Sequence, residues 1–236
     1  CQAVSKKYVR SDYGVKMQAN WHDATFNYCI NANYGYFYCE YLRNLSAPFC
    51  FLDIGSNQGL YSLIAAKNSH CGSVWAFEPV DNTFRVLADN IVANELDSRI
   101  TPVRSAISSS SGFAKINIKK GHSGGASLCQ LNDLSGVLNE DVRLMTSSDL
   151  NGMIKGDDQI VVKIDVEGHE DVVIQEILKC SFRARIHSIY YEMDERWNDP
   201  EVVESTLFKS GFQCFTKVMG GKDFHYDVLA SLNTPK

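Results

Sequence analysis

The sequence FCFLDIGSNQGLYSLIAA (residues 49–66) predicts a strand, a tight turn and a helix in direct succession. Residues 49–54 form an apolar run with the length of a buried strand, and apolar residues recur at helical spacing from Leu60 onward. Gly55 and Gly59 bound the turn between them. Glycine lets the backbone turn sharply and approach a ligand, and the first turn of a helix offers free N–H groups to it. The stretch therefore predicts the opening of a nucleotide-binding α/β unit.

The remaining sequence continues this alternation of strands and helices. Apolar and β-branched runs predict strands, whereas 3.6-residue periodicity predicts helices. The expected strands lie at residues 72–79, 100–107, 113–118, 159–168, 186–193, 212–218 and 226–232, and the expected helices at residues 37–45, 82–91, 170–179 and 201–210. Successive strand and helix steps indicate an α/β fold with a mostly parallel sheet covered by helices on both faces. A turn at residues 220 and 221 is expected to make the last strand an antiparallel edge.

Length and composition favour one α/β domain behind an N-terminal extension. The chain has 236 residues, of which 44% are hydrophobic, as is typical of a globular domain. We expect the extension, with an aromatic-rich helical segment, at residues 1–45 and the α/β domain at residues 46–236. Residue 1 is Cys rather than Met, which indicates a processed form or a piece of a longer polypeptide.

The charge and cysteine patterns argue against several classes of protein. The net charge is −5 and the Lys and Arg residues are scattered, which argues against a nucleic-acid partner. The sequence contains no apolar run of about 18 residues that would predict a membrane span. The eight cysteines are widely spaced without a C-x-x-C pair, so neither a zinc site nor a disulfide scaffold is expected. Several lie in apolar runs, as reduced thiols do, which favours a cytoplasmic, reducing compartment over secretion.

Polar and acidic residues follow the ends of the predicted strands. In an open α/β sheet the ligand binds outside the carboxyl ends of the strands, where the strand order reverses. Carboxylates do not belong on buried strands without a partner, so their concentration at these ends predicts the binding site. The residues concerned are 53–59, Glu78, Ser105, Ala106, Asp165, Glu167, Glu192 and Asp194.

Glu78 and Asn57 indicate which ligand this site takes. Glu78 follows Gly55 by roughly the 20-residue offset at which a carboxylate binds a ribose diol in βαβ nucleotide sites. A G-x-G-x-x-G motif would place its second glycine at position 57, where this chain has Asn57. The backbone there is less able to approach a pyrophosphate, which favours a nucleoside without phosphates. S-adenosylmethionine is such a ligand.

Three segments of the sequence resemble one family. FLDIGSNQGLYS, AFEP and VVKIDVEGHEDVV are similar to the D-x-G-x-N-x-G, F-E-P and K-I-D-V-E-G-x-E patterns of the FkbM-type S-adenosylmethionine-dependent methyltransferases, over residues 49–195. The resemblance implies the seven-stranded class I methyltransferase fold, with its Rossmann-like sheet and an antiparallel last strand. It also implies O-methylation of a hydroxyl, often of a sugar in a glycan or glycoconjugate.

The resemblance assigns roles to individual residues as well. It implies that the loop after the first strand binds the methionine part of the cofactor, that Glu78 binds the ribose, and that Asp165 faces the reacting methyl group. The implied cofactor-binding residues are Asp53, Gly55, Ser56, Asn57, Gly59, Glu78, Pro79, Ser105, Ala106 and Asp165, with Ser105 and Ala106 at the adenine edge.

Methyl transfer to an alcohol requires alignment and a base for the hydroxyl proton. His169 is a candidate base, or else a solvated residue at the start of a helix. Asp165 and Glu192 are the other catalytic candidates, and alternatively the two could share a divalent cation that lowers the pKa of the alcohol. The candidate substrate-binding residues are His122 and Ser123 in a Gly/Ser loop and Tyr36 in the aromatic-rich segment, for which simple packing is the alternative. The remaining histidines give no functional signal and are His22, His70, His187 and His225.

Two other functions remain open from the sequence. An NAD-dependent oxidoreductase or epimerase shares the carboxylate after the second strand, but it would require the G-x-G-x-x-G motif. A catalytically silent nucleoside-binding module would keep the fold in order to recognise a partner. The main hypothesis is an S-adenosylmethionine-dependent O-methyltransferase with a sugar or glycan acceptor.

Overall fold

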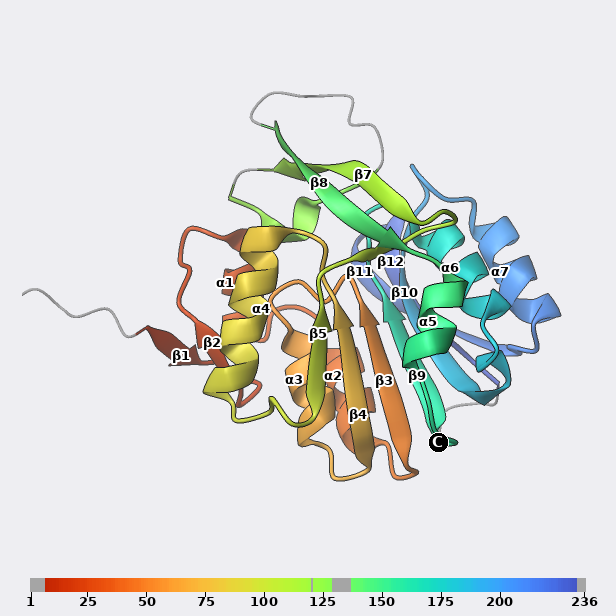
Figure 1. Cartoon of the computed structure of the whole chain (residues 1–236), viewed down its shortest axis with the longest axis horizontal. Helices are drawn as coiled ribbons and strands as arrows, with labels where there is room; N and C mark the ends of the chain where they lie inside the picture. The colour runs from red at the N-terminus through yellow and green to blue at the C-terminus, as the bar shows by residue number, and fades with distance from the viewer. Residues whose placement is uncertain (1–6, 120, 129–136, 233–236) are drawn as a thin grey trace, which may run out of the picture.

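The computed structural model describes residues 7–119, 121–128 and 137–232 and is built on a central seven-stranded sheet (Figure 1). In spatial order its strands are β11 (Cys214–Lys222), β12 (His225–Ser231), β10 (Ile186–Asp194), β9 (Gln159–Ile164), β3 (Phe49–Ile54), β4 (Cys71–Phe77) and β5 (Ile100–Val103). β12 is antiparallel to both of its neighbours, whereas the pairs from β10 to β5 are parallel. The predicted α/β fold, with a mostly parallel sheet and an antiparallel last strand, is confirmed.

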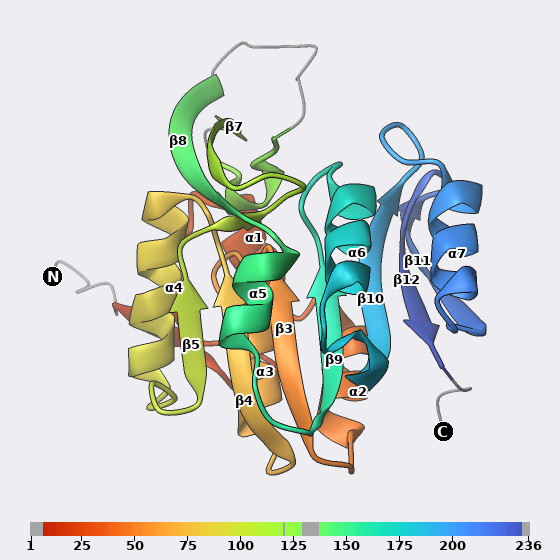
Figure 2. The ribbon, with the colours of Figure 1, turned by 45° about the vertical axis from the view of Figure 1, so that its right-hand side comes forward.

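Helices cover both faces of this sheet (Figures 1 and 2). The hydrophobic cluster on one face contains residues of α1 (Ala24–Ile30), α2 (Tyr36–Asn44), α3 (Leu60–Lys67) and α4 (Asp81–Ala93). The cluster on the other face contains residues of α5 (Ser147–Met153), α6 (Glu170–Lys179) and α7 (Pro200–Lys209). Side chains alternate along a strand, so Phe49 and Phe51 of β3 pack in the first cluster and Leu52 and Ile54 in the second. No helix within the described ranges is both long and apolar enough to cross a membrane.

The aromatic-rich segment packs mainly against the first face. Tyr38 of α2 is fully buried and its ring stacks on that of Tyr190 in β10 at a centroid distance of 3.9 Å. The preceding strands, β1 (Tyr8–Arg10) and β2 (Lys16–Gln18), pair with each other, and the neighbouring Val15 and Met17 are buried in the same cluster as α3. The division at residue 45 stays a prediction.

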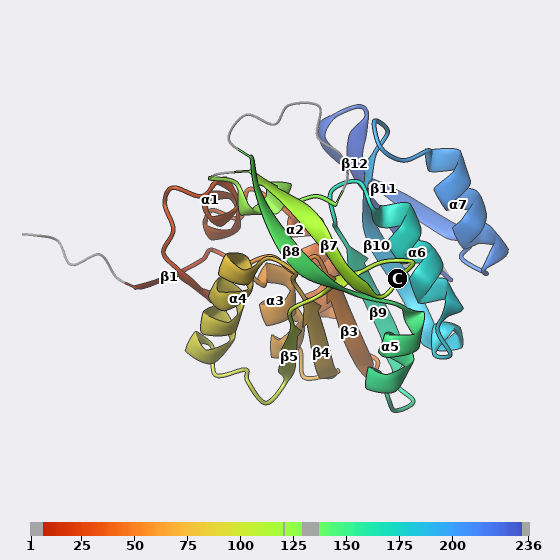
Figure 3. The same ribbon diagram turned by 45° about the horizontal axis from the view of Figure 1, so that its top comes forward.

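A smaller three-stranded sheet lies above the carboxyl ends of the central strands (Figures 2 and 3). It consists of β6 (Ala106–Ile107), β8 (Val137–Met145) and β7 (Gly112–Lys119), and a short 3₁₀ helix, η1 (Ser123–Gly125), follows β7. The strand expected at residues 100–107 is therefore split, because the chain turns out of the central sheet after Val103. Ser105 stabilises this turn, since its N–H donates to Val103 O and its hydroxyl donates to Arg104 O.

Two further boundaries differ from the sequence-based expectation. The strand expected at residues 159–168 ends at Ile164, so the acidic residues after it belong to a loop. The turn expected at residues 220 and 221 lies instead at residues 223 and 224, and the glycine pair falls within β11, where the register to β12 shifts. β12 is inserted between β10 and β11, so the antiparallel strand is internal and not an edge.

Candidate functional site

A cavity of about 470 Å³ lies at the carboxyl ends of the parallel strands, between the central sheet and the smaller one. Of the fifteen residues given a catalytic, cofactor-binding or substrate-binding role from sequence, twelve line it, namely Gly55, Ser56, Asn57, Glu78, Pro79, Ser105, Ala106, His122, Ser123, Asp165, His169 and Glu192. The other three do not line it. Asp53 is fully buried beneath the loop, Gly59 is the N-cap of α3, where an added Cβ would press on Leu87, and Tyr36 is 64% exposed on the first turn of α2.

Strand register brings the central site residues together. Ile54 at the end of β3 pairs with Phe77 of β4 on one side and with Ile164 of β9 on the other. Ile164 in turn pairs with Tyr191 of β10. The next residue of each strand or the loop after it therefore emerges at the same level, next to the point where the strand order reverses. These four residues are Gly55, Glu78, Asp165 and Glu192.

The loop after β3 requires glycine at its first position. Gly55 has a φ of +74°, and an added Cβ would overlap the carbonyl oxygen of Asp165. Asn57 also has a positive φ, of +49°, a conformation that Asn tolerates better than most residues. Its N–H donates to Glu78 Oε2 over 3.0 Å. The loop is thus closely packed against the ends of β4 and β9.

Glu78 joins the loop to the second strand of the unit. The residue is 5% exposed, and its Oε1 accepts a hydrogen bond from Val80 N at 2.9 Å while Oε2 accepts the one from Asn57 N. Burial raises the pKa of Glu78 to about 7. A carboxylate oxygen can accept more than one hydrogen bond, so the two oxygens retain acceptor capacity toward a ribose diol in the cavity.

Three buried polar atoms of the cavity lining lack a hydrogen-bond partner among the described residues. They are Ser56 Oγ, Gln58 Oε1 and Tyr61 OH, on side chains that are at most 5% exposed. Buried polar groups are nearly always paired in folded proteins, so these atoms point to a polar ligand. The hydroxyl, amino and carboxylate groups of S-adenosylmethionine supply both donors and acceptors, and the lining therefore fits this cofactor.

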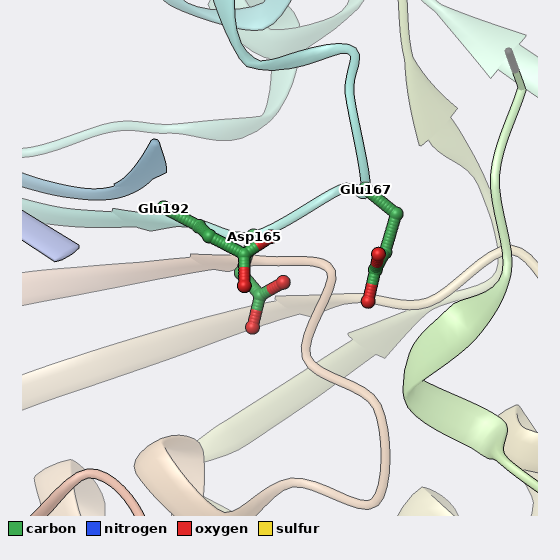
Figure 4. A group of neighbouring side chains, drawn as sticks. All are labelled: Asp165, Glu167 and Glu192. Carbon is green, nitrogen blue, oxygen red and sulfur yellow. The ribbon is translucent and has the colours of Figure 1, made fainter. Parts of the chain in front are cut away.

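Carboxylates crowd the wall formed by the ends of β9 and β10 (Figure 4). Ligand oxygens of Asp165, Glu167 and Glu192 lie within 4.8 Å of one another. Burial and the neighbouring carboxylates raise the pKa of Glu167 and that of Glu192 above their usual range. Oxygen donors suit a hard divalent cation. The alternative in which Asp165 and Glu192 share a cation stays a prediction, with Glu167 as an added donor.

Three histidines line the cavity, namely His122, His169 and His225, and the last two lie in different environments. His169 Nε2 lies 3.1 Å from Ser108 Oγ, and burial lowers the pKa of its imidazole. His225 of β12 places Nε2 2.6 Å from Glu192 Oε1, and this hydrogen bond raises the pKa of His225. His225 was not predicted from sequence. It reaches the site only because β12 pairs with β10, where Asp194 is opposite His225, and no local motif signals that pairing.

Asp23 links η1 by hydrogen bonds to the loop after β3 (residues 55–59, the cofactor loop). Asp23 is 5% exposed and caps α1, where its Oδ1 accepts from Phe26 N. It also accepts from Ser123 N at 2.9 Å and from Gln58 Nε2 at 3.0 Å. The hydroxyl of Ser123 lies within hydrogen-bond distance of Asp23 and Asn57 oxygens. The hydroxyl predicted to bind substrate is therefore engaged with the protein itself.

Solved structures share this fold at low sequence identity. The human methyltransferase 10 domain containing protein is 14% identical, with a TM-score of 0.53 over 94% of this chain and 90% of that chain. The delta-N METTL16 MTase domain is 15% identical, with a TM-score of 0.53 over 95% of this chain and 92% of that chain. The M. jannaschii tRNA m1G37 methyltransferase is 11% identical, with a TM-score of 0.54 over 96% of this chain and 54% of that chain.

The family itself follows from a sequence match. No curated protein sequence matches this chain significantly. The model of the methyltransferase FkbM domain, in contrast, matches residues 53–214, which is more than half of the chain and includes the cofactor loop, Glu78, Asp165 and Glu192. The chain belongs to the FkbM methyltransferase family, and S-adenosylmethionine is its cofactor.

Proposed function

We propose that this protein is an S-adenosylmethionine-dependent O-methyltransferase that acts on a hydroxyl of a sugar in a glycan or glycoconjugate. The observation that carries the proposal is the hydrogen-bonded pair of Glu192 and His225 beside Asp165 in the cofactor cavity. A hydroxyl acceptor must lose its proton as it attacks, and a histidine held by a carboxylate is a suitable base.

In this proposal, different residues of the cavity bind different parts of the cofactor. The polar atoms of Ser56, Gln58 and Tyr61 bind the methionine end, Glu78 binds the ribose hydroxyls, and Ser105 and Ala106 line the adenine edge. The bound cofactor supplies an electrophilic methyl group on sulfur. Asp165 and the ends of β9 and β10 align the acceptor with it, and alignment of this kind provides much of the rate in a displacement reaction.

The charge of the cavity wall favours a neutral acceptor over a nucleic acid. Asp165 and Glu192 would repel phosphates when they are ionised, whereas carboxylates accept hydrogen bonds readily from sugar hydroxyls. Tyr28 lines the same cavity and is 51% exposed, so its ring is available to stack on a sugar face. The buried free thiols Cys29, Cys39, Cys50, Cys71 and Cys180 agree with the proposed cytoplasmic location.

Transfer of isotopically labelled methyl groups to a panel of acceptors tests this function. We expect label in neutral oligosaccharides or glycoconjugates, with linkage analysis of the product identifying a methyl ether. A parallel reaction with tRNA should stay unlabelled, and transfer to tRNA in place of glycans would contradict the proposal.

A third reaction, after treatment with EDTA, decides whether the hydroxyl is activated by a base or by a cation that Asp165 and Glu192 share. Full activity after chelation excludes the shared cation.

His225→Gln should slow methyl transfer by about 10²–10⁴-fold, the usual contribution of a general base. Its hydrogen bond to Glu192 raises the pKa of His225, and Asp194 and Asp227 add to the effect. His225 accepts a proton only when it is neutral, so kcat/KM should fall as the pH decreases through this raised pKa. The substitution should remove that acidic limb while leaving the affinity for S-adenosylhomocysteine unchanged. A comparable loss in His169→Gln, with an intact limb in His225→Gln, would instead assign the base to His169.

A further inference from the structure

Lys163 of β9 is a cation buried beneath the cofactor loop. Its side chain is 4% exposed, and its Nζ donates a hydrogen bond to Gly55 O over 2.7 Å. The same Nζ lies 3.4 Å from Asp165 Oδ2 and 3.6 Å from Asp53 Oδ1. Burial of an ammonium group is unfavourable unless it is paired and hydrogen-bonded. Lys163 therefore has one hydrogen bond, to Gly55 O, and two ion-pair contacts, to Asp165 and Asp53.

The contact to Gly55 fixes a peptide group of the loop. The peptide that joins Gly55 to Ser56 has its carbonyl held by Lys163, and its N–H donates to Phe77 O over 2.9 Å. Both polar groups of this peptide are therefore hydrogen-bonded, the carbonyl to a residue of β9 and the N–H to a residue of β4. The direction in which the chain enters the loop, and with it the position of Ser56, depends on both contacts.

The two carboxylates next to Lys163 have different surroundings. Asp53 is fully buried, and its Oδ2 accepts a hydrogen bond from Ser62 Oγ at 2.6 Å. The Asp165 side chain is 24% exposed, lines the cavity, and has Tyr34 OH 3.5 Å from the oxygen that faces Lys163. Register explains the arrangement, because Asp53 and Lys163 are paired residues on β3 and β9. Lys163 thus connects a structural carboxylate to one that faces the ligand.

We propose that Lys163 is a positioning residue that holds the Gly55 peptide and the Asp165 carboxylate in the geometry that binds the methionine end of S-adenosylmethionine. The inference rests on the proposed division of the cofactor among the cavity residues. Lys163 acts through the loop and through Asp165, so its removal should affect the nucleoside end, which lies toward Glu78 and Ser105, much less than the methionine end.

Two ligands that differ in the methionine end test this role. S-adenosylhomocysteine contains that end, and 5′-methylthioadenosine lacks it. Lys163→Met should weaken binding of S-adenosylhomocysteine by about 10- to 100-fold, the range for loss of a charged hydrogen bond, while 5′-methylthioadenosine binding changes little. Lys67→Met is the matched control, because Lys67 also donates to a backbone carbonyl, Gly14 O at 2.8 Å, but lies outside the cavity lining. Equal losses for the two ligands, or no loss, would overturn the proposal.

Hydrogen exchange in the free protein gives a second measurement that does not depend on any ligand. Lys163→Met should accelerate amide exchange in a peptide that covers residues 54–59, whereas Lys67→Met should not. If removal of the charge prevents folding, the charge-balanced variant Lys163→Met with Asp53→Asn replaces it in both measurements. A wild-type protein that binds neither nucleoside would contradict the proposed function, and the exchange rates would still decide the role of Lys163. Unchanged exchange in residues 54–59 would overturn that role.

Discussion

Gly55→Ala should lower the free energy of unfolding by about 2–5 kcal/mol, from the cost of a left-handed conformation plus that of overpacking. The φ of Gly55 is +74°, and an added Cβ would overlap the carbonyl oxygen of Asp165. Backbone atoms of two adjacent strands cannot move apart without breaking the pairing of β3 with β9. Urea denaturation would measure the loss, and calorimetry should show that binding of S-adenosylhomocysteine is lost with it.

Gly156→Ala separates the two causes of that effect. Gly156 has a similar φ of +85°, but no atom lies within 4 Å of an added Cβ there. The substitution should therefore cost only the conformational strain, about 1–2 kcal/mol, and leave cofactor binding unchanged. Equal destabilisation by the two variants would show that contact with Asp165 contributes nothing at position 55.

Glu78→Gln should weaken binding of S-adenosylhomocysteine by about 1.5–3 kcal/mol, the range for hydrogen bonds to a charged group. Both oxygens of Glu78 accept from backbone N–H groups, so a glutamine would direct its NH₂ at Asn57 N or Val80 N. The loop would then shift while the ribose loses a charged acceptor. The affinity of the wild type should also fall as the pH drops below about 7, the raised pKa of Glu78, because the protonated carboxyl is a poorer acceptor.

Glu176→Gln is the control for Glu78. Glu176 is 3% exposed and its Oε2 accepts from Ser147 N at 2.9 Å, yet it lies outside the cavity lining. Glu176→Gln should change the free energy of unfolding and leave the affinity for S-adenosylhomocysteine unchanged. Titration calorimetry of both variants compares them directly, and a dissociation constant unaffected by Glu78→Gln would remove the ribose role from this residue.

Parallel strands explain why much of the site could be predicted from sequence. Each strand of such a sheet ends at the same edge, so Gly55, Glu78, Asp165 and Glu192 are brought together once the strands are recognised. The strands themselves are recognisable because they are buried on both faces and read as continuous apolar runs. The cofactor loop could therefore be predicted from local sequence patterns alone.

The site residues that could not be predicted from sequence depend on contacts between segments distant in the chain. Lys163 occupies the interior of an apolar strand, and its partners become evident only when β9 is placed beside β3. Tyr61 appears in sequence as one more apolar position of a helix, although it lines the cavity and has a buried, unpaired hydroxyl among the described residues. Asp53 was expected in the cofactor site because it lies near the end of a strand, whereas its side chain is fully buried on the face of Phe51, toward α3.

The internal position of β12 has a consequence for the order of assembly. During synthesis β10 and β11 are both made before the strand that separates them, so neither can complete its pairing until residues 225–231 emerge. A nascent chain that stops short of them leaves two strand edges unpaired and lacks His225. Chains truncated before residue 225 should consequently aggregate, since open edges recruit other strands. If His225 is the base, as proposed, such chains should also fail to transfer methyl groups.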